Sequence, residues 1–356
     1  MKLKKRKLCS MRIDWIIWFV GVLVLSVALS AAVKNLALRF GIVDVPSDSR
    51  KIHTAPVARA GGIAIYSALA IALILLLQTS NVLTSGQISQ WHYIGFLLGG
   101  LILIIGGTFD DKFNLPPRVT FLFPVAASAT AILFGIEISK LTNPFGGTIM
   151  IEKWQSDIIV FVWLLCVMYT TKFLDGLDGL AAGVSAIGSL MIMLLSLSVA
   201  YFQPDVALFS FVCLGVLLGF LVLNFNPARL FLGEGGSTFV GYILGVLAVI
   251  SGGKLATAAL VIGIPALDAV WVILRRARTG GIKQIVKADR KHLHHRLLDA
   301  GLSQRRTVFL YYLLAAGFGA SALFLQSREK LIAVGILSAV MIAVAVALVI
   351  HERKKI

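Results

Sequence analysis

Long apolar stretches limit this chain to very few folds. A helix needs roughly 20 consecutive apolar residues to cross about 30 Å of hydrocarbon, and stretches of about 17 to 20 such residues recur along the whole chain. They begin near Trp15, Gly62, Tyr93, Val119, Ile158, Gly183, Val206, Thr238, Leu255, Thr307 and Leu331, and the stretch at Thr238 is the shortest. We therefore predict about eleven transmembrane helices, with about ten as the alternative count.

The composition agrees with a membrane protein. Hydrophobic residues make up 58% of the chain, the mean hydropathy is +0.91 and 14% of residues are charged, against about 25% in typical soluble proteins. Open sheets cannot lie in hydrocarbon, and the stretches are too long for the strands of a membrane barrel. We expect an all-α polytopic bundle in which residues 13–356 form one integral membrane domain after a basic tail of residues 1–12.

Basic residues are concentrated in alternate loops. The net charge of +16 would suggest nucleic acid in a soluble protein, but in a membrane protein lysine and arginine mark the cytoplasmic loops. The basic loops cover residues 39–61, 108–118, 172–180, 224–237, 275–306 and the tail after His351. We place these loops in the cytoplasm and expect no nucleic-acid partner. The basic N-terminus does not fit this pattern, because eleven spans would put it outside: either the span count is off by one or the tail is a local exception. We interpret the first stretch as a retained helix and not a cleaved signal peptide.

Three acidic turns lie at the ends of apolar stretches on this same side. Asp110 and Asp111 are adjacent, Asp175 and Asp178 lie in a glycine-rich turn, and Glu234 lies in another glycine-rich turn. Adjacent carboxylates repel unless a cation or a shared proton relieves them, and ionisable groups at a membrane boundary are costly unless they bind something. The turns indicate a site for a metal ion, a phosphate or both.

Structural roles would account for some of the same residues. The aspartates could cap helices, and the glycines could allow helices to pack closely. If their turn is helical, Asp175 and Asp178 would share one helix face. A glycine-rich turn that leads into a helix is also the arrangement in which backbone N–H groups and the helix dipole bind phosphate.

Two loops carry cationic side chains suited to an anionic substrate, although any positive cytoplasmic loop would look similar. The earlier loop contains Arg50, Lys51, His53 and Arg59, and the later one contains Arg290, His292, His294, His295 and Arg296. Zinc is disfavoured in the later loop, because zinc ligands on a helix usually have i, i+4 spacing and a carboxylate or cysteine partner. The interleaved arginines and lysine would also repel a metal.

These loops together resemble the polyprenyl-phosphate N-acetylhexosamine-1-phosphate transferase family, in its undecaprenyl-phosphate GlcNAc-1-phosphate form. The resemblance covers most of the chain, and the motifs occur in the family's order. They are Asp44-x-Pro46 with Arg50-Lys51-x-His53 and Arg59-x-Gly61-Gly62; Gly106-x-x-x-Asp110-Asp111; Phe173-x-Asp175-Gly176-x-Asp178-Gly179-Leu180-Ala181-x-Gly183; Asn224-Phe225-Asn226-Pro227 through Glu234 to Ser237; Pro265-x-x-Asp268; and His292-x-His294-His295-Arg296.

The resemblance implies that a polyprenyl phosphate attacks a UDP-N-acetylhexosamine and releases UMP, usually with Mg²⁺, for which Mn²⁺ can substitute. It implies an active site on the cytoplasmic face of the plasma membrane, with a homodimer as an expectation. The expected roles are catalysis by Asp110, Asp111 and Lys51; metal binding by Glu234 and Asp178; nucleotide or donor binding by Lys172, Asp175 and Asn226; sugar-diphosphate binding by Arg290, His292, His294, His295 and Arg296; and lipid-phosphate binding by Arg50, His53 and Arg59.

The chain departs from the family pattern where the metal would bind. Tyr169 and Lys172 replace two asparagines before the glycine-rich turn, and Glu234 replaces an aspartate. Glutamate can bind Mg²⁺, but a protonated lysine cannot. Two arrangements are open: Lys172 pairs with Glu234 and weakens metal dependence, or it contacts the donor diphosphate while Glu234 still binds metal. Thr120 and Pro124 replace a usual lysine and glutamine.

Two other functions are compatible with parts of the sequence. A cation-coupled transporter would also carry acidic residues near helix breaks, but it would place them near the bilayer midplane, often within a repeated half. An inactive paralogue would explain the departure at Lys172. We favour the transferase, because the acidic and basic motifs fall in loops on one predicted side.

Overall fold

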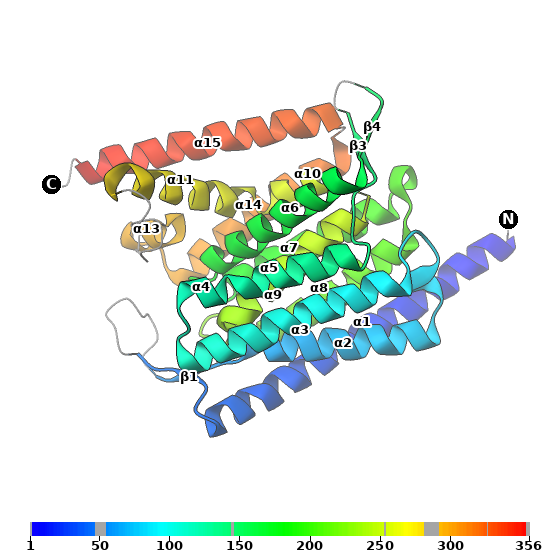
Figure 1. Ribbon diagram of the computed structural model, residues 1–356, viewed down its shortest axis with the longest axis horizontal. Coiled ribbons are helices and arrows are strands. Elements are labelled where there is room, and N and C mark those ends of the chain that lie inside the picture. The colour runs from blue at the N-terminus through cyan, green and yellow to red at the C-terminus, as the bar shows by residue number, and fades with distance from the viewer. Residues whose placement is uncertain are drawn as a thin grey trace.

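The chain folds into a bundle of long helices that run roughly side by side (Figure 1). The computed structural model describes residues 2–46, 55–143, 146–252, 254–280, 292–325 and 327–353. The helices are α1 (Lys2–Arg39), α2 (Gly61–Thr79), α3 (Gln90–Phe113), α4 (Pro117–Thr120), α5 (Leu122–Leu133), α6 (Lys153–Leu174), α7 (Leu180–Leu197), α8 (Pro204–Asn224), α9 (Gly233–Ile250), α10 (Leu255–Val261), α11 (Gly263–Gly280), α13 (Leu293–Asp299), α14 (Gln304–Phe324) and α15 (Ser327–Arg353).

The predicted all-α polytopic membrane architecture is confirmed. In the described ranges, 8 helices are long and apolar enough to cross a membrane. The stretch at Thr238 is among them, as part of α9. The pair α10 and α11 is bent by 72° at its break, and Pro117–Leu133 is a shorter apolar helix. Each predicted stretch therefore falls on a helix or a broken helix, while the total number of spans stays a prediction.

Two small sheets lie at opposite ends of the bundle. At one end, β1 (Val43–Asp44) pairs antiparallel with β2 (Val57–Arg59), and β2 pairs parallel with β5 (Leu230–Phe231). In this register Arg59 lies opposite Phe231, close to the start of α9. The other end carries the hairpin of β3 (Lys140–Thr142) and β4 (Thr148–Met150) (Figure 1).

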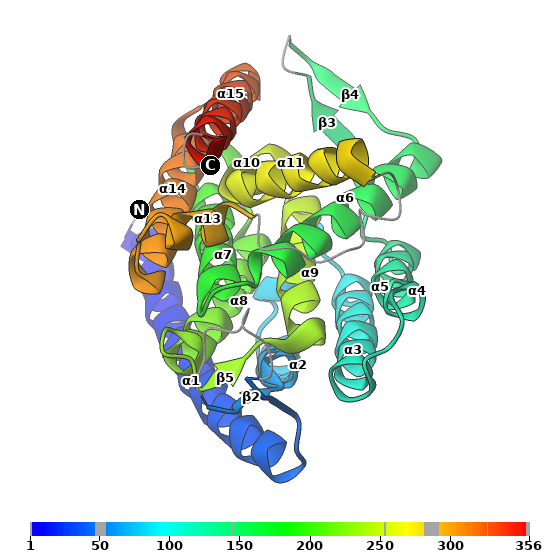
Figure 2. The same cartoon turned by 90° about the vertical axis from the view of Figure 1, so that its left-hand side faces the viewer.

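Helix α9 forms the centre of the bundle. Seen from the end that carries β2 and β5, it lies between α2, α3, α6 and α7 (Figure 2). Of its residues, 89% are buried. Glycines allow this packing: a Cβ added to Gly62 would lie 2.6 Å from Gly236, and one added to Gly107 would meet Gly235. Because backbone contacts backbone here, the first turn of α9 is fixed beside the ends of α2 and α3.

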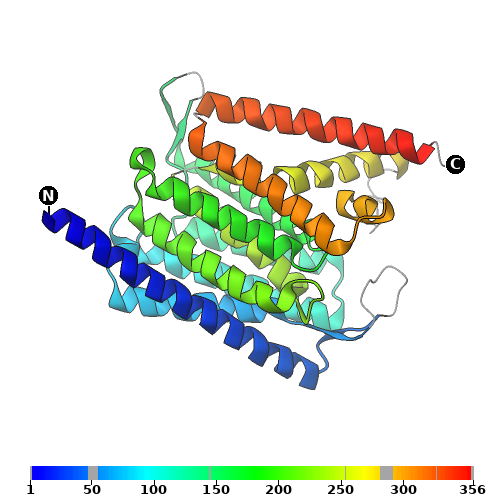
Figure 3. The same ribbon diagram turned by 180° about the vertical axis from the view of Figure 1, so that it is seen from behind.

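The two chain ends lie at opposite ends of the bundle (Figures 1 and 3). Residues 2–12 of the basic tail form the first turns of α1, which lies along the outside of the bundle against α8 (Figure 3). The acidic turns lie at the end where α15 finishes. This arrangement agrees with an odd number of crossings, and which end faces the cytoplasm stays a prediction.

Candidate active site

Two of the three acidic turns line a cavity of about 740 Å³ at one end of the bundle, and Asp110 of the third turn lines a smaller hollow that shares Lys172 and Glu234 with it. The walls of the larger cavity come from β2, from the turn between α6 and α7, from the segment between α8 and α9, and from the first turns of α9 and α14. The charged side chains that line it include Arg59, Lys172, Asp175, Asp178 and Glu234. The sequence prediction that these distant turns form one site agrees with this geometry.

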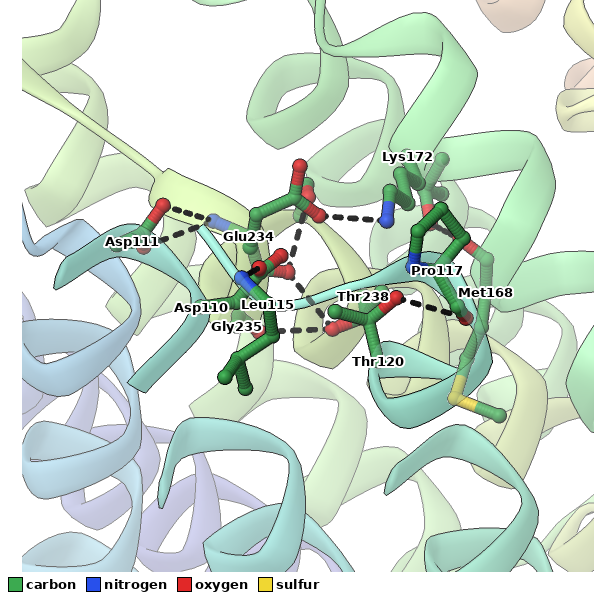
Figure 4. A network of polar contacts seen from close by, with 12 residues as sticks. Asp110, Asp111, Leu115, Pro117, Thr120, Met168, Lys172, Glu234, Gly235 and Thr238 are labelled. Atoms are coloured by element: carbon green, nitrogen blue, oxygen red, sulfur yellow. Dashed lines mark hydrogen bonds and ion pairs between the residues drawn. The ribbon is translucent and has the colours of Figure 1, made fainter. Parts of the chain in front are cut away.

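Glu234 lies at the centre of a charged network (Figure 4). Its Oε2 is 2.6 Å from the Lys172 Nζ, and its Oε1 is 3.6 Å from the Arg59 Nη2. The Arg59 Nε in turn lies 2.9 Å from an oxygen of Asp111. Burial alone would lower the pKa of Arg59, but the carboxylates of Asp111 and Glu234 outweigh that effect and raise it. The guanidinium is therefore permanently charged.

The start of α9 is held by Asp111 of α3. The backbone N–H of Glu234 donates to both oxygens of the Asp111 carboxylate, at 3.0 and 3.2 Å (Figure 4). Gly233 has a φ of 75°, and a Cβ added there would clash with Asp111. A carboxylate at a helix N-terminus satisfies free N–H groups and opposes the helix dipole. Asp111 thus occupies the backbone donor that a phosphate would use in the phosphate-binding turn considered from the sequence.

The adjacent aspartates have different surroundings. Asp110 accepts a hydrogen bond from the backbone N–H of Leu115 at 2.8 Å, after Asn114 ends α3 with a φ of 49° (Figure 4). Asp110 also borders a smaller hollow beside the main cavity, which Lys172 and Glu234 line from the other side. Asp111 is 4% exposed and fully engaged, so Asp110 is the member of the pair with the more accessible carboxylate.

The glycine-rich turn between α6 and α7 is not helical, so Asp175 and Asp178 do not share a helix face. Asp178 accepts hydrogen bonds from the Asn226 side chain at 2.9 Å and the Ala228 N–H at 3.1 Å. Gly179, with a φ of 80°, donates its N–H to Asn224 at 3.1 Å. These bonds fix the segment between α8 and α9 against the turn, so Asp178 shapes the cavity wall.

Asp175 contrasts with the other carboxylates. Its half-buried side chain lines the cavity, and in the described part of the chain it makes no hydrogen bond or ion pair. Burial raises the pKa of Asp175 to about 7, although the charge of Arg59 opposes this shift. A carboxyl group with a pKa near neutrality can exchange a proton or accept a cation at physiological pH.

The histidine loop packs behind the cavity. His292 and His294 are buried, and of the histidines only His295 is among the residues that line the described cavity. The His292 Nδ1 is 2.9 Å from Asp268, and the Phe173 ring stacks on His292 at 5.8 Å. The contact of His294 with Gly176 leaves no room for a Cβ on that glycine. Burial, with His295 and His292 nearby, lowers the pKa of His294, so this ring is neutral at pH 7.

Several residues that shape this site had no functional role predicted from the sequence. Asp268 appeared as a motif residue, and it anchors His292 and accepts the Leu293 N–H at 2.9 Å. Gln304 accepts from Asn226 at 2.8 Å, and Tyr312 donates to the Gly179 carbonyl at 2.6 Å. Nothing in the sequence pattern of α14 marks these two residues. Among the residues with an expected role, Arg50, Lys51, His53 and Arg290 lie outside the described ranges, and Arg296 is buried.

A divalent metal does not fit this donor set well. Mg²⁺ is held by one or two carboxylates, with water and phosphate completing the shell, and cationic side chains already paired with those carboxylates compete with it. Glu234 is paired with Lys172 and Arg59, Asp111 with Arg59, and Asp178 with Asn226. Throughout the described ranges, no three His, Cys, Asp or Glu side chains are grouped as metal ligands. Asp175 is the lining carboxylate described above whose side chain makes no such bond. It is a single ligand, however, and not the pair of Glu234 and Asp178 that was expected to bind the metal.

Known proteins similar to this chain are named as transferases that act on a polyprenyl phosphate. The sequence model of glycosyl transferase family 4 matches residues 93–252. A probable undecaprenyl-phosphate N-acetylglucosaminyl 1-phosphate transferase of Bacillus subtilis is 31% identical over 319 residues, covering 88% of this chain and 85% of the relative. The decaprenyl-phosphate N-acetylglucosaminephosphotransferase of Mycolicibacterium smegmatis is 33% identical over 347 residues, covering 89% and 84%. The undecaprenyl-phosphate alpha-N-acetylglucosaminyl 1-phosphate transferase of Escherichia coli K12 is 26% identical over 298 residues, covering 80% and 76%. The identity and coverage show that this chain belongs to glycosyl transferase family 4, the family of the polyprenyl-phosphate N-acetylglucosamine-1-phosphate transferases.

Proposed function

We propose that this protein transfers N-acetylglucosamine-1-phosphate from UDP-N-acetylglucosamine to a polyprenyl phosphate, at the cytoplasmic face of the plasma membrane. The observation that carries the proposal is the cavity at one end of the helix bundle, where carboxylates and cations from β2, α6 and α9 converge. A water-soluble donor reaches such a cavity from the aqueous side, and a lipid acceptor reaches it from the bilayer. The names of the family relatives support the acceptor and the sugar.

The reaction exchanges one phosphoanhydride bond for another. An oxygen of the lipid phosphate attacks the β-phosphorus of the donor, and the bond from that phosphorus to the bridging oxygen breaks. UMP leaves with the bridging oxygen and the electron pair. A dianionic lipid phosphate needs no proton transfer, whereas a monoanionic one gives its proton to a nearby base. Asp110 suits that role, because its carboxylate has the more accessible position of the adjacent pair.

Positive charge is the main requirement of this chemistry, since two phosphorylated substrates must approach each other. In the described part of the cavity, Arg59 and Lys172 are the charged cationic side chains that line the wall. We assign both to the donor diphosphate, which for Arg59 replaces the role at the lipid phosphate expected from the sequence. Asn226 and Asp175 are assigned to the nucleotide and His295 to the sugar. The assignments of Arg50 and His53 to the lipid phosphate, of Lys51 to catalysis and of Arg290 to the donor stay predictions.

The direct test is UMP release by the purified protein. We expect release only when undecaprenyl phosphate and UDP-N-acetylglucosamine are both present, and slower release with UDP-glucose. Asp110→Asn should lower turnover by about 100-fold, the scale of a positioned acid–base group. Asp157→Asn is the matched control, because Asp157 lies near the start of α6, at the far end of that helix from the site.

Several outcomes would contradict the proposal. Absence of UMP release from well-folded protein with each UDP-sugar would reject the transferase. Uptake of a small solute into proteoliposomes, driven by a cation gradient, would support the transporter considered from the sequence. The carboxylates of the described cavity lie at the bundle end, which favours surface chemistry over midplane transport. The homodimer stays a prediction for mass measurement of the protein in lipid.

A further inference from the structure

The ion pair of Lys172 and Glu234 occupies a central position between the two hollows. Both residues line the main cavity and the smaller hollow beside Asp110. Their side chains are 27% and 25% exposed, so the pair is shielded from bulk water without being closed off. An ammonium ion at this point faces the donor site on one side and Asp110 on the other.

The ammonium is held by several favourable interactions. Lys172 lies in the last turn of α6, where a cation opposes the helix dipole, and Glu234 lies in the first turn of α9, where an anion does the same. The Lys172 Nζ is 5.9 Å from the centre of the Tyr169 ring, within the range of a cation–π contact. Close packing of α6 on α9 at Gly241, against Met168, fixes the distance between the two helices.

In this position the ammonium competes with a divalent cation for Glu234. Mg²⁺ binds a carboxylate oxygen at about 2.0 to 2.1 Å, but the ammonium already lies 2.6 Å from Oε2. The other oxygen faces Arg59 at 3.6 Å. A metal ion placed there would be repelled by both cations, and a protonated lysine has no lone pair with which to bind it. The side chains therefore already supply the local positive charge.

We propose that the Lys172 ammonium, held by Glu234, takes the place of a divalent cation and neutralises the donor diphosphate. This inference rests on the proposed transfer reaction and adds that the reaction proceeds without a metal ion. Lys172 acts through its charge alone: the lipid oxygen bonds to the β-phosphorus, the bridging oxygen leaves with UMP and the electron pair, and no proton is exchanged with the lysine. Lys172 and Tyr169, which depart from the family pattern, are thereby given a function.

Metal binding can be measured without any turnover. Titration of the purified protein with Mn²⁺, followed by electron paramagnetic resonance, should detect no stoichiometric site in the wild type at micromolar metal. Lys172→Asn frees Glu234 and should bind Mn²⁺ at least about 10-fold more tightly than the wild type. Lys172→Gln, closer to lysine in length, should behave alike and guards against misfolding of one variant. Equal Mn²⁺ affinity of the wild type and both variants would overturn the inference.

Lys112→Asn is the matched control, since Lys112 is an exposed lysine in the last turn of α3 and its ammonium lies over Phe113 at 5.4 Å. It should leave Mn²⁺ binding unchanged. A gain of Mn²⁺ binding in this control as large as in Lys172→Asn would contradict a specific role for Lys172.

UMP release in EDTA and in Mg²⁺ provides the second measurement. The wild type should keep most of its turnover in EDTA, whereas Lys172→Asn should lose at least about 10-fold in EDTA and recover on addition of Mg²⁺. Complete loss of wild-type turnover in EDTA, restored by Mg²⁺, would overturn the inference and leave the proposed function intact. Absence of turnover in every buffer would reject the proposed function, and the Mn²⁺ titration would then decide the inference alone.

Discussion

Arg59 and Asp111 should act as one functional unit, and a double-mutant cycle can measure their coupling. The Asp111 side chain is 4% exposed and the Arg59 side chain is 33% exposed, and the Arg59 Nε lies 2.9 Å from the Asp111 Oδ1. Asp111→Asn keeps an oxygen for the Glu234 N–H but removes the charge that holds the guanidinium beside the cavity. Arg59→Gln removes the same interaction from the other partner.

The expected coupling lies between those of exposed and buried ion pairs. Exposed pairs contribute up to about 1 kcal/mol, and loss of one partner from a buried pair costs about 3 to 5 kcal/mol. Because Arg59 is one-third exposed, we expect about 2 kcal/mol, equivalent to roughly 30-fold in kcat/KM. Each single variant should lose about that factor, and the double variant should lose little more than either single one.

The assay is UMP release at limiting UDP-N-acetylglucosamine, with folding checked by thermal unfolding. Asp110→Asn provides the comparison, because Asp110 bonds to the Leu115 N–H rather than to Arg59. Its effect should multiply with that of Arg59→Gln. If the losses in Asp111→Asn and Arg59→Gln also multiply, the two residues act independently and our account of the network is wrong.

Three further predictions concern packing, pH and topology. Gly107→Ala should lower the Tm by the equivalent of about 1 to 3 kcal/mol, because its Cβ would meet the α9 backbone, whereas Gly21→Ala, with open space around it, should not; equal shifts would contradict the close contact. Burial lowers the folded-state pKa of His294, so the free energy of unfolding should fall as the pH drops below the unfolded-state pKa of about 6.5. His294→Gln should reduce this pH dependence in unfolding measurements at pH 5 and 7.5. An unchanged pH dependence would show that His294 is not the titrating group. Single cysteines replacing Gln87 and Gly280, in a cysteine-free background, should label from outside and inside respectively; labelling from one side would refute the span count.

The sequence predicted the helices and the acidic turns well for a physical reason. A stretch such as the one that begins near Tyr93 must become a helix in hydrocarbon, whatever its neighbours are. The carboxylates of Asp110, Asp175 and Glu234 were recognisable because charge at such a boundary is costly and needs a partner. Their convergence at one end of the bundle followed from the shared side of the membrane and from the family's motif order.

The pairing of individual side chains could not be predicted in the same way. Whether Lys172 contacts Glu234 or the donor depends on the distance between α6 and α9, which side-chain packing sets and no local pattern encodes. The different surroundings of Asp110 and Asp111 arise because α3 ends between them and Leu115. Gln304 and Tyr312 join the site through tertiary contacts alone. The break between α10 and α11, by contrast, is marked in the sequence by Pro265, which cannot donate a hydrogen bond to the Val261 carbonyl.

The glycine contacts of α9 determine where the site tolerates amino-acid change. Gly62 meets Gly236 and Gly107 meets Gly235, backbone against backbone, directly beside the charged network. A side chain can rotate away from a new neighbour, but two backbones in contact inside a packed bundle cannot move apart without disturbing the surrounding helices. In a scan of all substitutions, charged residues such as Glu234 should accept a few similar replacements. The glycines at these contacts should accept no substitution.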